Sequence, residues 1–438
     1  MPRLPRRATL LLLGLLGLST LINVYDYRVF RNWFIASQLL GVFNLYAAAP
    51  VLGHEFRVVY PPLAPLLFLA SLAFIAAIYP SYVMSTIPAI PIRAALKAPI
   101  IALLYVGYSV LERRVGPDAA KLFIFNIVVL AVINVYSFDI PATVAALLAI
   151  YSGASSPVLA AALTATATLL KQSFALLVLP LTLYYATKRD WRSLGLFATS
   201  YTTIILCVTL PFLVFSGFTP LLDYLLLFHA ERLPQGVSIW MLPLLLSGYN
   251  IKVGKTLSSY WVIPFVALLA IGLYRVRHVL DAPEGLEVAT TLVLLAFLAT
   301  SKVLNPQYMV WPIPFLAALA ARGKARRAYK LYTIAALLEV FYPVLYITSA
   351  AVVAKPFFLE EEARWAPASM AVGLVEDSLP EIGTLLLAVL RSQPFYSLFE
   401  LVYTAWPFIH ACLALAYTTL MLLVFVDVIN AAKLRPSE

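Results

Sequence analysis

The sequence predicts an all-α polytopic membrane protein, and its composition, its apolar runs and the distribution of its charges each support this. Of the 438 residues, 62% are hydrophobic and only 12% are charged, and the mean hydropathy is +0.90. This composition leaves too little polar surface to cover the core of a soluble protein of this length. It excludes soluble enzymes and nucleic-acid-binding proteins. Both cysteines, Cys207 and Cys412, lie in apolar runs, which excludes a disulfide-rich scaffold.

Apolar runs recur along the whole chain. A helix needs about 20 mostly apolar residues to cross the hydrocarbon core of a bilayer. We expect about 12 transmembrane helices on this basis, at residues 8–25, 94–111, 121–137, 140–152, 157–173, 174–187, 193–214, 258–274, 286–302, 308–321, 330–352 and 400–427.

The positions of Lys and Arg predict which loops face the cytoplasm, because these residues are enriched on that side. They gather in short segments, at 3–7, 113–121, 188–192, 275–277, 322–330 and 433–435. All of these segments share one side only if the apolar run at 61–79 does not cross the membrane. We therefore expect that run to form a re-entrant or surface helix on the outer side, and both termini to be cytoplasmic.

Two long segments, 26–93 and 353–399, then fall on the outer side. Irregular chain and clustered polar side chains favour a functional site there. We expect juxtamembrane helices in the first of these loops. No domain-sized soluble insertion interrupts the apolar pattern, so a single integral-membrane domain over residues 1–438 accounts for the chain.

Two acidic residues occur at the expected outer membrane boundary. Asp26 follows the first apolar run and precedes an aromatic and basic stretch, which would place its carboxylate near lipid headgroups. The alternative is an interfacial anchor in which Asp26 pairs with Arg28 or Arg31. Asp139 lies in an outer turn before Ile140 and is a second candidate acid, with a helix cap as the alternative.

Cations, amides and aromatic residues cluster near the outer ends of several apolar runs. Cationic side chains at these ends suit a phosphate, and the candidates are Arg57, Lys171, Arg232 and Lys302. Neighbouring polar and aromatic residues suit a sugar or an acceptor, with Tyr27, Tyr60, Gln172, His229, Trp240, Gln307 and Tyr308 as candidates. The alternative is that all of them anchor the protein to lipid headgroups.

Other polar residues give weaker indications. The four histidines, His54, His229, His278 and His410, show no metal-ligand spacing, so we predict no metal. Glu339 lies within an apolar run, where a charge is costly, and we expect it to face the helix bundle without assigning it a role. The acidic run at 360–362 is expected to be a solvated loop.

Taken together, the clusters resemble the GT-C superfamily of integral-membrane glycosyltransferases that use polyprenyl-phosphate sugars. The resemblance is closest to the GPI mannosyltransferase catalytic subunit and its prokaryotic relatives. It rests on five segments in family order: Asp26–Phe30, Arg57–Ala64, Lys171–Gln172, His229–Trp240 and Ser301–Trp311. One departure is that Val24 stands where the family often has the first acid of an Asp-x-Asp motif.

The resemblance implies a GT-C-like bundle and an inverting transfer of a hexose, with mannose as the first expectation. The donor would be a polyprenyl (dolichyl) phosphate sugar, and the acceptor a lipid-linked glycan or glycolipid. Asp26 would be the catalytic base, and the four cations would hold the donor phosphate without a metal or another cofactor. Membrane lipids are expected partners and nucleic acids are not. The site would face outward from the cell membrane, or into the lumen from the endoplasmic reticulum membrane.

A multi-span lipid or solute transporter or flippase is the alternative function, since buried charges in many spans also suit transport. The sequence lacks an evident inverted repeat. A functional site at the outer end of the bundle would favour the transferase, and a site at the membrane midplane would favour transport.

Overall fold

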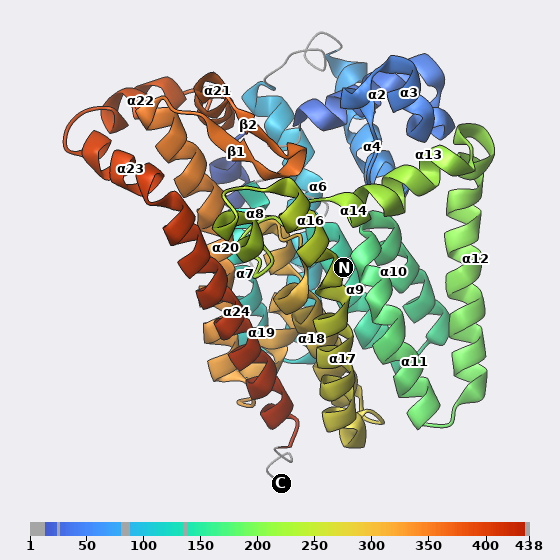
Figure 1. Ribbon diagram of the computed structural model, residues 1–438. Coiled ribbons are helices and arrows are strands. Elements are labelled where there is room, and N and C mark those ends of the chain that lie inside the picture. The colour runs from blue at the N-terminus through green and yellow to red at the C-terminus, as the bar shows by residue number, and fades with distance from the viewer. Residues whose placement is uncertain (1–13, 24–26, 80–87, 135–138, 434–438) are drawn as a thin grey trace.

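The computed structural model describes residues 14–23, 27–79, 88–134 and 139–433, and this part of the chain is almost entirely helical (Figure 1). Long helices run between an upper and a lower end, and shorter helices form a cap over the upper end. The predicted all-α class is confirmed.

Six helices are long and apolar enough to cross a membrane, within the described residues. They contain 18 to 29 residues each, which corresponds to about 27–44 Å at 1.5 Å per residue. They are α6 (Ile90–Arg114), α12 (Trp191–Ser216), the continuous stretch Ile251–Val279, α18 (Pro283–Thr300), α20 (Arg326–Val353) and α24 (Trp406–Ala431). The continuous stretch comprises α16 (Ile251–Ser258), η5 (Ser259–Trp261), α17 (Val262–Val276) and η6 (Arg277–Val279).

Shorter apolar helices pack among the long ones. They are α7 (Pro117–Ile124), α8 (Ile127–Asn134), α9 (Asp139–Gly153), α10 (Pro157–Leu170), η3 (Gln172–Leu177), α11 (Val178–Thr187), η7 (Pro306–Val310) and α19 (Ile313–Ala321). α7 and α8 meet at a bend of 47°. Asn126 stabilises this bend, because its Oδ1 accepts from Val128 N at 2.9 Å and its Nδ2 donates to Tyr329 Oη at 2.9 Å.

Several helices begin at side chains that accept a hydrogen bond from the first turn. Ser156 does so for α10, Asp190 for α12 and Asn250 for α16, with N···O distances of 3.0–3.2 Å. Such caps satisfy amide groups that have no partner within the helix. They fix where these helices start.

The segment at 26–93, predicted to be on the outer side, folds in its described part into a compact group at the upper end. Its elements are α2 (Tyr27–Leu40), η1 (Val42–Ala47), α3 (Ala48–Leu52), η2 (His54–Phe56) and α4 (Leu63–Ile78). The chain turns by 113° after α2, at Gly41, whose φ of 85° is costly for other residues. Phe30 stacks on Phe68 with ring centroids 3.7 Å apart, which joins α2 to α4.

Two further segments complete the cap (Figure 1). The first contains α13 (Phe218–Leu222), η4 (Asp223–Leu227), α14 (Phe228–Glu231) and α15 (Met241–Leu246). The second contains β1 (Phe357–Leu359), η8 (Glu360–Glu362), β2 (Arg364–Ala366), α21 (Ala368–Ser378), α22 (Gly383–Leu390) and α23 (Phe395–Thr404). The strands pair antiparallel with Phe358 opposite Trp365.

α9 lies in the core, between α6, α10 and α18. Most of its side chains are buried, and many are Ala. Small residues let neighbouring helices approach closely, which is how helices gain packing energy in a membrane. This helix begins at Asp139, so the core also delivers that acid to the upper end of the bundle.

The structure bears on several sequence predictions. Each predicted span from 94–111 onward overlaps one or more helices of the structure. Among the described residues, however, only six helices have the length and apolar composition of a membrane span, or up to nine spans if each bent helix pair counts as one. The number of crossings therefore stays a prediction.

α4 lies beside α2 and α3 in the upper cap (Figure 1). The turns between α11 and α12, α17 and α18, and α19 and α20 all lie at the lower end.

Candidate functional site

Three of the segments singled out in the sequence meet at the upper end of the bundle. The 228–240 segment lies against the 300–311 segment, where Gln235 N donates to Lys302 O at 2.9 Å and Leu304 N donates to Gln235 O at 3.2 Å. It also contacts the 57–64 segment, because His229 Nε2 donates to Val59 O at 2.8 Å. These hydrogen bonds bring parts of the chain that are distant in sequence into one cluster.

Asp139 and Lys171 form a buried ion pair in this cluster. Lys171 Nζ lies 3.9 Å from Asp139 Oδ1, and the two side chains are 1% and 0% exposed. Trp311 Nε1 donates to the same carboxylate oxygen at 2.8 Å. The Lys171 ammonium also lies 4.4 Å from the Tyr308 ring centre and 4.9 Å from the Tyr60 ring centre. Asp139 thus orients Lys171 between two aromatic rings.

Arg57 and Arg232 approach the same aromatic ring. Their guanidinium carbons lie 4.7 Å and 5.6 Å from the centre of the Phe228 ring. Arg57 O accepts from Trp33 Nε1 at 2.9 Å, which ties this segment to α2. Arg232 donates to Gln235 Oε1. Cation–π contacts of this kind hold guanidinium groups without neutralising their charge.

Lys302 and His229 complete the cluster. Lys302 Nζ donates to Ala230 O at 2.6 Å. Burial lowers the pKa of Lys302, and the nearby charges of Lys255 and Arg232 lower it further. Burial also lowers the pKa of His229 to about 4, with smaller contributions from Arg232 and Lys171. His229 is therefore neutral at pH 7 and presents a protonated Nε2 to Val59.

The electrostatics of this cluster favour an anionic ligand. Asp139 balances the charge of Lys171, whereas the hydrogen-bond partners of the other cations include neutral groups: His54 Nε2 for Arg57, the Gln235 amide for Arg232 and the Ala230 carbonyl for Lys302. Glu231 near Lys302 and Glu360 near Arg232 offset part of this positive charge. Guanidinium and ammonium groups that converge in this way bind phosphate through charge-assisted hydrogen bonds.

The residues predicted to contact a sugar or acceptor fall in the same region, with one exception. Tyr60 and Tyr308 flank Lys171, and Gln172 and Gln307 are half-buried beside them in sequence. Trp240 Nε1 donates to Thr300 O at 2.7 Å and thereby joins the two loop segments. The exception is Tyr27, which is buried in the core at the start of α2.

Asp26 lies outside the described residues, so its predicted role is not tested by its surroundings. Arg28 and Arg31 are the two alternative partners of Asp26. Arg28 Nη2 lies 2.6 Å from Asp377 Oδ2, in α21. α2 is thus joined to α21 at this point.

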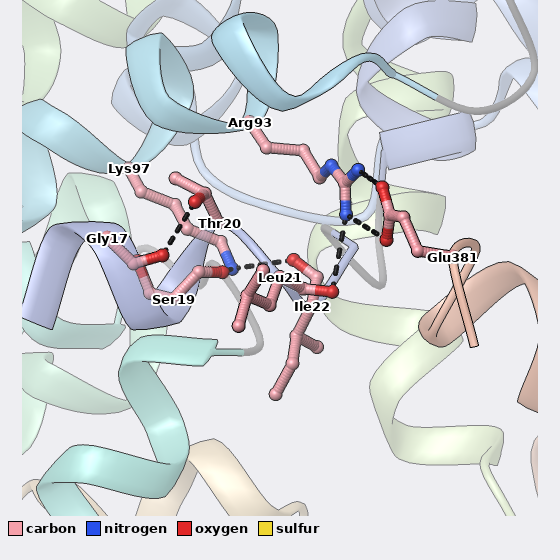
Figure 2. Close-up of polar contacts among 8 residues, drawn as sticks. All are labelled: Gly17, Ser19, Thr20, Leu21, Ile22, Arg93, Lys97 and Glu381. Carbon is pink, nitrogen blue, oxygen red and sulfur yellow. Dashed lines mark hydrogen bonds and ion pairs between the residues drawn. The ribbon is translucent and has the colours of Figure 1, made fainter. Parts of the chain in front are cut away.

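Sequence reasoning missed a pair of buried cations at the start of α6 (Figure 2). Arg93 forms an ion pair with Glu381 and donates to Leu21 O at 3.3 Å. Lys97 Nζ donates to Ile22 O at 2.9 Å and to Ser19 O. These cations bind backbone carbonyls at residues 19–22, directly before the Asp26 segment. The signal in the sequence was an Arg and a Lys four residues apart within an apolar run, where one helical face carries both.

The expectation of a solvated loop at 360–362 is wrong for Glu360. Its Oε2 accepts from Gly236 N at 3.1 Å, and its Oε1 accepts from Tyr342 Oη. Burial raises the pKa of Glu360 to about 7, although these hydrogen bonds and the charge of Arg232 oppose the shift.

Glu339 faces the bundle as expected and accepts from Val237 N at 2.8 Å. Among the described residues, no His, Cys, Asp or Glu cluster could hold a metal ion.

No family model and no curated protein matches the sequence. Among solved structures, the chain is similar to ArnT from Cupriavidus metallidurans in the apo state, with a TM-score of 0.45 and 15% identity over 97% of this chain and 76% of that one. ArnT from the same organism bound to undecaprenyl phosphate gives a TM-score of 0.44, with the same identity and coverage. These values are too low to transfer a fold or a function.

Proposed function

We propose that the chain is a membrane glycosyltransferase that takes its sugar from a polyprenyl phosphate. The observation that carries this proposal is the convergence of Arg57, Lys171, Arg232 and Lys302 at one end of an apolar helix bundle. Each comes from a different segment of the chain, and each lies beside an aromatic ring or a loop carbonyl. Such a site suits a phosphate that is attached to a lipid.

A path for the lipid tail supports the same function. Exposed apolar side chains continue from the end of α12 through α13 and η4, with Phe215, Phe218, Leu226 and Leu227 all at least 46% exposed. This apolar surface ends at Phe228, which is the ring between Arg57 and Arg232. A polyprenyl chain lying along it would bring its phosphate to the two guanidinium groups.

The finer proposal concerns the reaction. The acceptor hydroxyl attacks the anomeric carbon, the bond from that carbon to the phosphate oxygen breaks, and the hydroxyl proton passes to the Asp26 carboxylate. The cations stabilise the negative charge on the departing phosphate, which is how preorganised charges lower such barriers. We propose a hexose, with mannose first, a lipid-linked or glycan acceptor, and a site on the outer face of the membrane. In this proposal the four cations hold the phosphate and no metal is required.

The position of the cations favours transfer over transport. A transporter is expected to bind its substrate near the membrane midplane, between two halves that alternate in access. The Arg57–Phe228–Arg232 contacts are instead made by elements of the upper cap, α14 and the segment after η2 (Figure 1).

The test is a transfer assay with purified protein in nanodiscs, a panel of radiolabelled polyprenyl-phosphate hexoses and a native lipid extract. We expect labelled product with at least one donor, and none with nucleotide sugars alone. Lys302→Ala should weaken binding of polyprenyl phosphate by about tenfold or more, the loss expected for a charge-assisted hydrogen bond. Lys330→Ala is the matched control, since Lys330 is exposed in α20 away from the cluster. Equal effects of the two variants would make Lys302 a headgroup anchor.

A further inference from the structure

The peptide at Gly236 is held by three side chains from the C-terminal part of the chain. Glu360 Oε2 accepts from Gly236 N at 3.1 Å, and Glu339 Oε2 accepts from Val237 N at 2.8 Å. His410 Nε2 donates to Gly236 O at 2.8 Å. Consecutive amides are thus bound by carboxylates from two different elements, α20 and η8, while the intervening carbonyl is bound by α24.

The loop conformation and these carboxylates depend on each other. Gly236 has a φ of +69°, which is costly for a residue with a side chain. A Cβ at this position would also lie 2.5 Å from Glu339 Oε2. Glycine therefore lets the backbone approach the carboxylates closely enough to donate both hydrogen bonds.

This peptide lies directly beside the proposed phosphate site. Gln235 precedes it, accepts from Arg232 through its side chain, and pairs through its backbone with Lys302 O and Leu304 N. A shift of the Gly236 peptide would therefore move Arg232 and Lys302 relative to each other.

We propose that Glu360, Glu339 and His410 are positioning residues that fix the Gly236 peptide and thereby set the separation of Arg232 and Lys302 for a lipid phosphate. The part of the chain after Trp311, which contains none of the five segments of the family resemblance, completes the donor site in this way. This inference rests on the proposed function, because it takes the phosphate as the ligand of those two cations.

The experiment measures the affinity of the full-length protein in nanodiscs for polyprenyl phosphate. Glu360→Ala removes the acceptor for Gly236 N and Tyr342, and should weaken binding by about tenfold or more, since small displacements of positioned groups have large effects. Glu360→Gln keeps one oxygen that accepts from Gly236 N, and its amide nitrogen can donate to Tyr342 Oη in place of the lost acceptor, so the affinity should stay within about threefold of wild type. Glu362→Ala is the matched control, because Glu362 lies two residues away and pairs with Arg364 at the surface.

A double-variant cycle separates positioning from general destabilisation. In an Arg232→Ala background, Glu360→Ala should change the affinity less than about twofold, because the group that it positions is gone. Full additivity would overturn the inference. Hydrogen exchange of the 232–240 amides gives a readout that needs no ligand, and it should quicken in Glu360→Ala but not in Glu362→Ala.

The outcomes distinguish the two proposals. Unchanged exchange at Gly236 and Val237 in Glu360→Ala would overturn the positioning role whatever the ligand is. Faster exchange together with no binding of polyprenyl phosphate by the wild-type protein would overturn the phosphate site, and with it this inference. If Glu360→Ala does not fold, Glu360→Gln combined with Gly236→Ala replaces it, and wild-type affinity in that variant would contradict the account.

Discussion

Replacing Asp139 by Asn should destabilise the protein through Lys171. The two side chains are 0% and 1% exposed, and their charged atoms are 3.9 Å apart. Asn keeps an oxygen that can accept from Trp311 Nε1, now 2.8 Å from Asp139 Oδ1, but it removes the negative charge beside the ammonium. Losing one partner of a buried ion pair costs about 3–5 kcal/mol, which changes the unfolding equilibrium more than ~100-fold.

The assay is unfolding in mixed micelles by titration with SDS, followed by tryptophan fluorescence. The double variant Asp139→Asn/Lys171→Met should recover most of the lost stability, because it removes both charges. Adding polyprenyl phosphate should stabilise Asp139→Asn more than wild type, since a bound phosphate would restore a negative charge near Lys171. A loss below about 1 kcal/mol, typical of an exposed pair, would refute the reasoning, as would equal stabilities of the single and double variants.

Two further predictions concern His229 and the ion pairs of Arg28 and Arg93. Because the folded-state pKa of His229 is lowered from 6.5 to about 4, the unfolded chain binds a proton in this range that the folded protein does not, and stability should fall as the pH falls from about 6.5 to 4. Thermal unfolding of His229→Gln across this range should show a flatter profile, and an unchanged profile would contradict the assignment. Asp377→Ala should cost at most about 1 kcal/mol, since its partner Arg28 is exposed. Glu381→Ala should cost more, because the Arg93 side chain is 2% exposed, and equal unfolding midpoints for these two variants would count against the buried anchor.

The convergence of the phosphate-site candidates could be predicted from sequence order. Lys171 and Lys302 each stand at the outer end of an apolar run, and Arg57 and Arg232 stand in outer segments between runs. Alternation of spans places such positions at one end of a bundle, whatever the details of packing. The pairing of Lys171 with Asp139 could not be predicted in the same way, because it depends on the packing of α9 against α10.

The residues that hold the site in place were harder to predict. Glu360 stands in a run of three acids within a polar segment, which is typical of solvated loops, and its partner Gly236 lies 124 residues away. Arg93 and Lys97 lie at the start of an apolar run, where cations are usually read as topology signals. In each case the role depends on contacts between segments remote in sequence, and a single sequence contains no periodicity that reports them.

The span count illustrates a different limit. Hydropathy identifies apolar length, but bends such as the 113° turn after α2 redirect the chain without changing composition. The prediction that the run at 61–79 does not cross the membrane rests on the charges of later loops and not on its hydropathy.

The most direct test of the central claim is the transfer rate of Asp26→Asn. Asn matches the shape of Asp and still accepts a hydrogen bond, but it is not basic at neutral pH and cannot take the acceptor's proton. A positioned general base contributes ~10²–10⁴ in rate. We predict that wild-type protein transfers label from a polyprenyl-phosphate hexose, and that Asp26→Asn binds the donor with wild-type affinity but transfers at less than about a hundredth of the rate. Transfer by Asp26→Asn at more than about a tenth of the wild-type rate would contradict the assignment of Asp26 as the base, and no transfer by the wild type from any polyprenyl-phosphate sugar would contradict the proposed function.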